Sequence, residues 1–412
     1  MNTVLSRDIG FTLEGRDVES RYTSQLLRDL GASVQLNSGK EDQPASNRWQ
    51  DSGLAALTGH PDNLLETCPV PVAAYGDGAF EALRLLSGNP FPAHYRGADL
   101  MSLRGAMSGD TPKGNTSIGG SCRFLHCADG LIALNLPRSS DWDLLDAWLL
   151  DEVEPSWEAV ESRVSAREKS QLLTQGRLLG LAVADAEPAL DLPRCWYSLD
   201  QRGTGLNKPR VAPLVIDLSS LWAGPLCGQL LRWAGAKVLK VESSQRPDGA
   251  RLGSPDFFHF LNQGKEELTL DLHKPAGRNE LRDLIASADM VIEASRPRAL
   301  RQMGIIAEDI VAANAGMTWI SITGYGRQDP EANWVAFGDD AGVAGGLSAT
   351  IQEATGQWLF CGDAIADPLT GIHAALAGLA SWRAGGGCLL SLSLVRTVEN
   401  CVLTHLHPQC HS

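Results

Sequence analysis

The chain has 412 residues and a formal net charge of −14, from 35 basic and 49 acidic side chains. This length can bury a large core and predicts two domains or three subregions. The acidic balance argues against a nucleic acid partner, because phosphate binding calls for a basic surface.

Signals for membranes or secretion are missing from the sequence. No apolar run approaches the ~18 residues that a membrane span needs. The early charges at Arg7, Asp8 and Glu14 do not fit a secretory signal. Nine scattered cysteines, an odd number, fit a reducing compartment better than a disulfide framework. We therefore expect a cytoplasmic protein.

The first hundred residues contain a sequence repeat. Gln25–Val34 and Gln229–Val238 match at seven of ten positions, which predicts that residues 1–100 are an abbreviated copy of a later domain. The alternative is a chance likeness between two ordinary helix–glycine–strand junctions. A helix is expected over Ala79–Leu86, opened by the glycine-rich Tyr75–Gly78.

A small α+β domain is predicted over residues 101–187. Asp129-Gly130 is a hairpin signal between the strand-like Cys122–Cys127 and Leu131–Leu136. Helical periodicity follows over Asp141–Leu150, Trp157–Val164 and Lys169–Leu179. Residues 188–212 are rich in proline and glycine, and we expect a linker there.

Residues 213–412 alternate between strands and helices. Leu214–Asp217 predicts a buried strand, Ala223-Gly224-Pro225 a helix start and Lys237–Val241 a second strand. Such a βαβ unit places its turn where open α/β sheets bind ligands. Later strands are expected at Leu268–Leu272, Met290–Glu293, Met317–Thr323 and Cys388–Val395, which predicts a doubly wound parallel sheet.

This region resembles a known family. The motifs are DLSSLWAGP from Asp217, GAKVLKVE from Gly235, NQGK from Asn262 and ADMVIEASRP from Ala288. Their order is similar to that of the class III CoA-transferases (CaiB/BaiF type). The resemblance implies a Rossmann-like sheet and a homodimer. It also implies transfer of CoA from an acyl-CoA thioester to a carboxylic acid. The small domain precedes the catalytic domain here, unlike in ordinary members, so the order looks permuted or fused.

The resemblance assigns Asp367 as the nucleophile that forms an aspartyl anhydride and then a thioester. Asp367 stands in a D-x-x-T-G-x-H segment similar to the family's active-site segment. An aspartate followed by a proline at the start of a helix also fits a purely structural N-cap. Asp363 is the rival nucleophile. The glycine-rich Gly342–Gly346 and Gly324–Gly326 are either donors to an oxyanion or tight turns.

The resemblance also implies positions that contact CoA, the substrate that stands in place of a cofactor. A loop of Leu221, Trp222 and Ala223 would touch the pantetheine arm. The basic side chains of Arg251, Lys265 and Arg296 would meet the phosphates. Each basic residue alone is more often a solvated surface charge. The tryptophan departs from the glutamine or small residue common at its position. No metal site is expected, and the C-terminal His/Cys tail is predicted to be disordered.

Two other functions are left open. Racemases related to this family carry a proton-shuttling histidine where this chain has Asp339, which disfavours two-base proton exchange although Asp339 or Asp340 remains a possible base. The abbreviated repeat and Trp222 also fit a CoA-binding protein without transferase activity. His373 matches a family position, but we expect it to be a packing residue.

Overall fold

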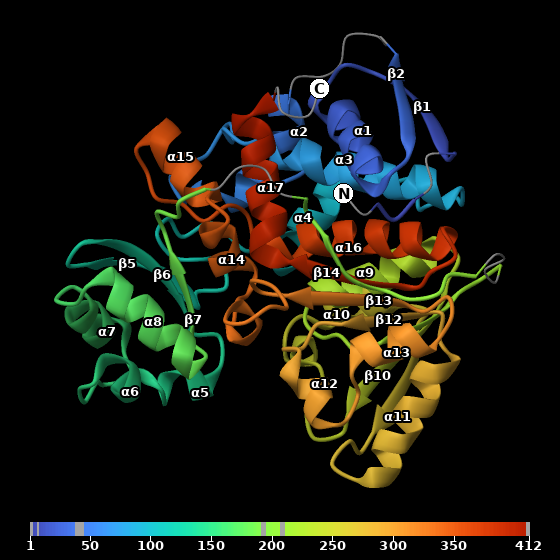
Figure 1. The fold of residues 1–412 in the computed structure, drawn as a ribbon. Coiled ribbons are helices and arrows are strands. Elements are labelled where there is room, and N and C mark those ends of the chain that lie inside the picture. The colour runs from blue at the N-terminus through green and yellow to red at the C-terminus, as the bar shows by residue number, and fades with distance from the viewer. Residues whose placement is uncertain (1–2, 6–7, 38–44, 191–194, 207–210, 409–412) are drawn as a thin grey trace.

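The computed structural model describes residues 3–5, 8–37, 45–190, 195–206 and 211–408 (Figure 1). Its largest sheet has seven strands in the order β11-β10-β9-β12-β13-β14-β8. Neighbouring strands are parallel throughout, except for β14 and β8, which are antiparallel. These strands are β8 (Ser198–Arg202), β9 (Leu214–Asp217), β10 (Lys237–Ser243), β11 (Glu266–Leu270), β12 (Met290–Glu293), β13 (Thr318–Thr323) and β14 (Cys388–Ser393). The parallel part runs 3-2-1-4-5-6 in chain order, which confirms the predicted doubly wound sheet.

Helices cover both faces of this sheet because its strands are apolar on both sides. In β9, Val215 belongs to the core on one face and Ile216 to the core on the other. The first face is covered by α9 (Ala223–Trp233) and α16 (Ala366–Arg383), and the second by α11 (Pro275–Ser287) and α13 (Ala307–Ala313). Shorter helices at the rim are α10 (Pro255–Asn262) and α12 (Arg298–Gln302).

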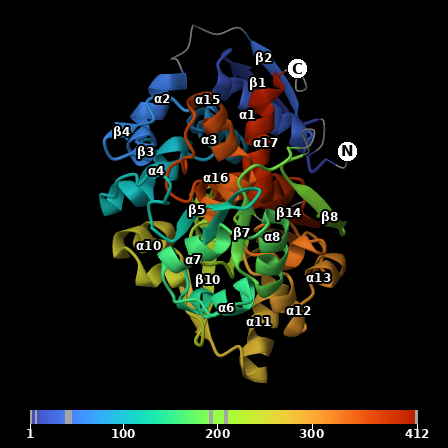
Figure 2. The same ribbon diagram turned by 90° about the vertical axis from the view of Figure 1, so that its left-hand side faces the viewer.

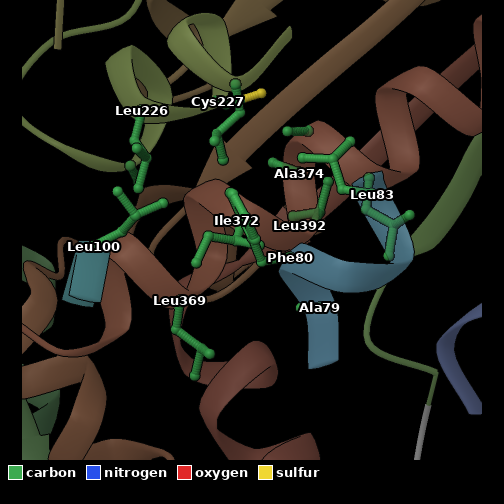
Figure 3. Packing of buried hydrophobic residues seen from close by; sticks show 14 of the residues in the cluster. Ala79, Phe80, Leu83, Leu100, Leu226, Cys227, Leu369, Ile372, Ala374 and Leu392 are labelled. Atoms are coloured by element: carbon green, nitrogen blue, oxygen red, sulfur yellow. The ribbon is translucent and has the colours of Figure 1, made fainter. Parts of the chain in front are cut away.

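The N-terminal segment packs on the outer side of α16. It begins with a parallel unit of β1 (Gly10–Glu14), α1 (Val18–Leu30) and β2 (Ser33–Asn37). It continues through α2 (Ala45–Asp51), β3 (Gly59–His60), β4 (Asn63–Leu64), α3 (Val72–Ser87) and α4 (Gly97–Ser108). Side chains from α3, α9 and α16 share one core, with Phe80, Leu226 and Ile372 among its members (Figure 3). α16 is therefore buried on all sides.

Two glycine contacts support the predicted duplication. A Cβ on Gly78 of α3 would lie 2.9 Å from the carbonyl oxygen of Glu19 in α1. A Cβ on Gly371 of α16 would lie 2.6 Å from the carbonyl oxygen of Ala223 in α9. Glu19 and Ala223 occupy the same place relative to the repeated QLLR sequence. Both halves thus use a glycine to bring two helices together, and the duplication stays a prediction that this likeness supports.

The small domain contains an antiparallel sheet of β5 (Cys122–Cys127), β6 (Gly130–Asn135) and β7 (Ala182–Asp185) (Figure 2). Its helices α7 (Trp157–Val164) and α8 (Lys169–Leu179) are those predicted, but Asp141–Leu150 divides into α5 (Ser139–Trp142) and α6 (Leu145–Leu149). Asn135 Nδ2 donates to Asp340 Oδ1 at 2.8 Å. This hydrogen bond ties the domain to α14 (Gly338–Ala344).

Several predicted boundaries differ from the structure. The helix expected from Ala79 begins at Val72, because the small residues before it are buried against neighbouring helices. The expected linker contains β8, an antiparallel edge strand, and the fully buried Trp196. α4 crosses the boundary placed after residue 100. Part of the expected disordered tail is helical, since residues 404–406 belong to α17 (Leu394–Leu406), and residues 409–412 lie outside the described part. α15 (Leu347–Thr355) lies earlier in the chain, between α14 and α16.

Within the described residues, none of the helices combines the length and apolar character needed to cross a bilayer.

Candidate active site

Asp367 lies in the first turn of α16, where the amino ends of two other helices meet it. Its carboxylate accepts backbone hydrogen bonds from Gly338, the first residue of α14, and from Ala223, the first residue of α9. Burial raises the pKa of Asp367 to about 6, and the charge of Arg104 and the two backbone bonds oppose this rise. Free N–H groups at helix starts favour an anion. Asp367 is therefore poised to be ionised near neutral pH.

The backbone around Asp367 is held in close and strained contact. Ala364 has a left-handed φ of 46°, which is rare outside glycine, and its N–H donates to Asp339 Oδ1 at 2.9 Å. A Cβ on Gly338 would lie 2.3 Å from the carbonyl oxygen of Ala364. Only glycine lets α14 begin so close to the segment that carries Asp367.

Gly338→Ala should disable this arrangement. The added methyl group would push the start of α14 away and withdraw one N–H from Asp367. The loss of one such donor typically costs on the order of 10²-fold in rate. Gly342→Ala on the same helix is the control, since its Cβ would meet only a side-chain methyl group, Cγ2 of Ile365, at 3.0 Å, and no backbone atom. Equal transfer rates for the two variants would contradict this role.

Arg104 enters the site from α4 and was not predicted. Its Nε and Nη2 donate to the two carboxylate oxygens of Asp363 at 2.7 and 2.5 Å. Its guanidinium carbon lies 4.7 Å from the centre of the Trp222 ring. Both oxygens of Asp363 are thus engaged, which argues against this rival nucleophile. Nothing in the local sequence of α4 signals Arg104, because its partners lie far along the chain.

Asp339 adds a third carboxyl group to the site. Burial, followed by the nearby charge of Asp363, raises its pKa to about 7, and Arg104 opposes the shift. Near neutral pH this group is present in both protonation states. Asp340, beside it, caps α14 and binds Asn135, so its role is structural.

The loop before α9 brings together the three residues predicted to touch pantetheine. Leu221 has a φ of 69° and a side chain that is 41% exposed, and its N–H donates to Asp248 Oδ1 at 2.8 Å. Trp222 is buried and packs edge to face on Phe257. Ala223 gives its N–H to Asp367. The loop is adjacent to Asp367, and contact of this loop with the pantetheine arm stays a prediction.

Lys265 is buried in an ion pair, which is a different environment from the one expected of a phosphate ligand. Its side chain has no exposed surface, and its Nζ lies 2.8 Å from both Asp217 Oδ2 and the carbonyl oxygen of Pro225. Burial alone would raise the pKa of Asp217, but the ammonium groups of Lys265 and Lys240 hold it below its usual range. The structure therefore gives Lys265 a structural role, because a buried lysine must be paired.

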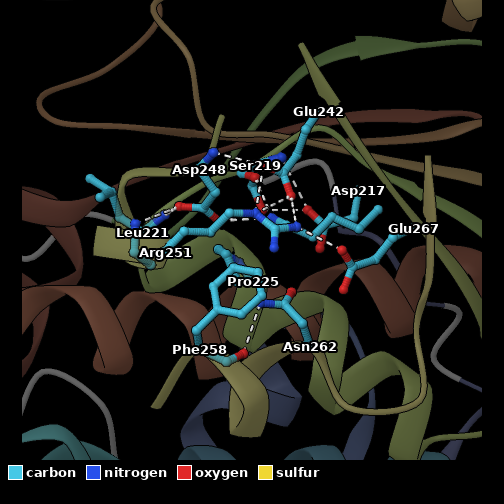
Figure 4. Close-up of polar contacts among 12 residues, drawn as sticks. Asp217, Ser219, Leu221, Pro225, Glu242, Asp248, Arg251, Phe258, Asn262 and Glu267 are labelled. Atoms are coloured by element: carbon cyan, nitrogen blue, oxygen red, sulfur yellow. Dashed lines mark hydrogen bonds and ion pairs between the residues drawn. The ribbon is translucent and has the colours of Figure 1, made fainter. Parts of the chain in front are cut away.

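Arg251 is also occupied by acidic partners. Its Nη2 lies 2.6 Å from Glu242 Oε1 and 2.6 Å from Glu267 Oε2, and its guanidinium lies over the Phe258 ring (Figure 4). These hydrogen bonds raise the pKa of Arg251. With its charge balanced, it is a weaker phosphate ligand than expected.

Arg296 lies instead in a cluster of positive charges between the sheet and the small domain. Burial lowers its pKa, and the charges of Arg298, Arg138 and Arg246 lower it further. Arg138 Nη2 donates to the carbonyl oxygen of Gly180, and Nη1 of Arg296 lies 3.5 Å from where a Cβ on Gly180 would be. Arg138 is also paired with Asp141, 2.6 Å from Oδ1, so part of the charge of the cluster is already balanced. Such a cluster in an acidic protein is a favourable place for a phosphate.

The glycine-rich stretches form turns and helix ends. Gly342 lies inside α14, Gly346 joins α14 to α15 with a φ of 84°, and the carbonyl of Gly324 accepts from Ser393. The backbone donors to Asp367 come from Gly338 and Ala223 instead.

His373 is fully buried, and Tyr22 lies 2.9 Å from its Nε2. Burial lowers the pKa of His373 to about 4, which fits a neutral packing residue. Among the described residues, no group of three or more His, Cys, Asp or Glu side chains is arranged to hold a metal ion.

The pH dependence of the donor half-reaction should follow Asp367. A carboxylate must be ionised to attack, so kcat/KM for the acyl-CoA should rise with pH through about 6. Because the charge of Arg104 lowers the pKa of Asp367, Arg104→Gln should shift this midpoint upward. Arg96→Gln, at the start of the same helix, is the matched control. A midpoint that stays unchanged in Arg104→Gln would show that Asp367 is not the titrating group.

The chain is similar to known proteins over its C-terminal half. The family model described as "CoA-transferase family III" matches residues 213–410. The chain is 31% identical over 217 residues to a succinate–glutarate CoA-transferase of Agrobacterium fabrum, covering 48% of this chain and 54% of that protein. It is 35% identical over 169 residues to a formyl-CoA:oxalate CoA-transferase of a Bradyrhizobium strain, covering 39% and 40%.

The chain thus spans about half the length of the curated relatives it matches. Among solved structures, a CaiB/BaiF family protein from Brucella suis aligns with a TM-score of 0.44 and 28% identity, covering 50% of this chain and 58% of that one. Residues 213–410 of the chain thus match the model of CoA-transferase family III, and the relatives that align with this chain are CoA-transferases.

Proposed function

We propose that this protein is a CoA-transferase that moves CoA from an acyl-CoA thioester to a carboxylic acid, with Asp367 as the covalent carrier. The observation that carries the proposal is the carboxylate of Asp367, held by the N–H groups of Ala223 and Gly338. The family match supports the same chemistry. That the substrates of the whole protein are an acyl-CoA and a carboxylic acid is part of the same proposal.

The first half-reaction loads CoA onto the enzyme. A carboxylate oxygen of Asp367 attacks the thioester carbonyl, the C–S bond breaks and CoA leaves as the thiolate. The thiolate then attacks Cγ of Asp367 in the mixed anhydride, and the donor acid leaves as its carboxylate. The product is an aspartyl-CoA thioester, and no proton is gained or lost overall.

The second half-reaction reverses these steps with another acid. The acceptor carboxylate attacks Cγ of Asp367 and expels the thiolate, which next attacks the acceptor carbonyl and releases Asp367. Two of the steps place a negative charge on an oxygen of Asp367 itself. The N–H groups of Ala223 and Gly338 are bound to that carboxylate, so they would serve as the oxyanion hole for both.

CoA would approach along the carboxyl edge of the sheet. The loop of Leu221 and Trp222 lies beside Asp367, and the cluster around Arg296 offers positive charge for the phosphates. Lys265 is omitted from this CoA site because it is buried in its ion pair.

Trapping of the loaded enzyme tests the proposal. The intact protein is incubated with succinyl-CoA, glutaryl-CoA or formyl-CoA, chosen from the names of its relatives, then treated with hydroxylamine and analysed by mass spectrometry. A hydroxamate or CoA adduct on the peptide containing Asp367, absent in Asp367→Asn, is expected. Measurable CoA binding without an adduct from any donor would refute the transferase.

A second candidate is α-proton exchange on an acyl-CoA, favoured by the buried Asp339 with its pKa of about 7. Deuterium uptake by the acyl-CoA without an acceptor acid would support it.

We further propose a homodimer, as the family resemblance implies, and a cytoplasmic location. The cysteines of the described residues, all of them free thiols, support a reducing compartment.

A further inference from the structure

Arg104 is held at the site by contacts on two sides. Asp363 engages Nε and Nη2, and the flat guanidinium lies over the Trp222 ring. The side chain remains 33% exposed. An arginine has five N–H donors, so the fork to Asp363 leaves the Nη1 amino group for a second anion.

The charges around Arg104 change during the proposed reaction. Before it begins, Asp363, Asp339 and Asp367 all act on Arg104, and each of their charges raises its pKa. Acylation makes Asp367 neutral, because its carboxylate becomes an anhydride or a thioester. Arg104 then faces one carboxylate fewer, while the acid that must react next is itself an anion.

We propose that Arg104 binds the carboxylate of the acceptor acid once Asp367 carries an acyl or CoA group. This inference rests on the proposed function and adds the acceptor site to it. The bound carboxylate attacks Cγ of Asp367, the C–S bond breaks and CoA leaves with the electron pair. Loading removes one negative charge from beside Arg104, so the loaded enzyme repels the acceptor carboxylate less than the free enzyme does. The order of binding thus follows from charge.

Asp367→Asn provides a stable imitation of the loaded state, because the amide is neutral and close in shape to the carboxylate. We expect glutarate, measured by isothermal titration calorimetry, to bind Asp367→Asn about 10-fold or more tightly than it binds the wild type. Adding Arg104→Gln to Asp367→Asn should abolish the gain. Arg104→Lys should retain part of it, since lysine keeps the charge but loses the fork.

Matched controls separate charge from folding. Adding Arg96→Gln to Asp367→Asn removes an arginine from the start of the same helix and should leave the gain intact. Dimethyl glutarate, which has no carboxylate, should not bind, and thermal melts establish that each variant is folded. Equal affinities of wild type and Asp367→Asn, or a folded double variant that binds as Asp367→Asn does, would overturn the proposal. The readout needs no turnover, so it is independent of the adduct test.

Discussion

Asp367→Asn is expected to lower the rate of CoA transfer by on the order of 10⁴-fold or more, the scale of loss when a covalent nucleophile is removed. The asparagine amide cannot attack a thioester, and other groups at the site do not replace it. CoA should still bind, because the loop of Leu221 and Trp222 is untouched. The variant should not be less stable at pH 8, since the folded protein penalises the charged form of this carboxyl. Steady-state transfer and CoA binding are the measurements.

Asp363→Asn is the informative companion. It removes the rival carboxylate but leaves Asp367, so an adduct on Asp367 should still form. Its transfer rate should fall less than that of Asp367→Asn, through the displaced Arg104 rather than through loss of the nucleophile. An adduct that survives Asp367→Asn but disappears in Asp363→Asn would show that Asp363, and not Asp367, is the nucleophile.

Lys265→Met is expected to destabilise the folded protein by about 3–5 kcal/mol, because it leaves Asp217 buried without its nearest cation. Urea unfolding monitored by tryptophan fluorescence provides the measurement. The double variant Asp217→Asn with Lys265→Met should recover part of the loss, since it no longer buries an unpaired charge.

The control is Lys274→Met, which breaks an exposed ion pair with Asp271. It should cause no measurable change in the free energy of unfolding. If Lys265 were instead a ligand for the CoA phosphates, Lys265→Met would weaken CoA binding and leave the unfolding curve unchanged. The two variants therefore separate a structural lysine from a binding one.

The sheet was predictable because its signals are local. Apolar runs such as Met290–Glu293 and the Asp129-Gly130 turn fix a strand or a hairpin within a few residues, and these elements are confirmed. β8 was missed because Ser198–Arg202 is polar, and its pairing with β14 is visible only once the fold brings them together. The early start of α3 has a similar cause, since Gly76 and Gly78 lower its helix propensity and the segment is helical because it is buried against neighbouring helices.

Some residues of the candidate site were predictable from local motifs, and others were not. Asp367 and the loop from Leu221 to Ala223 lie within recognisable motifs, and the structure brings them together. Arg104 has no motif, and its contact with Asp363 depends on α4 packing beside α16. Lys265 shows the opposite difficulty: its motif was recognisable, but whether a lysine meets a ligand or a buried aspartate is decided by packing.

The burial of α16 between the sheet and α3 ties the two halves of the chain into one cooperative unit. The helix that carries Asp367 packs on the sheet of the C-terminal half with one side and on α3 of the N-terminal half with the other. Deleting residues 1–108 would expose an apolar helix and remove Arg104 in the same event. The first quarter of the chain is therefore required for a stable and complete active site, although its own sequence carries no catalytic motif. Denaturant should accordingly abolish activity and N-terminal helical structure in a single shared transition.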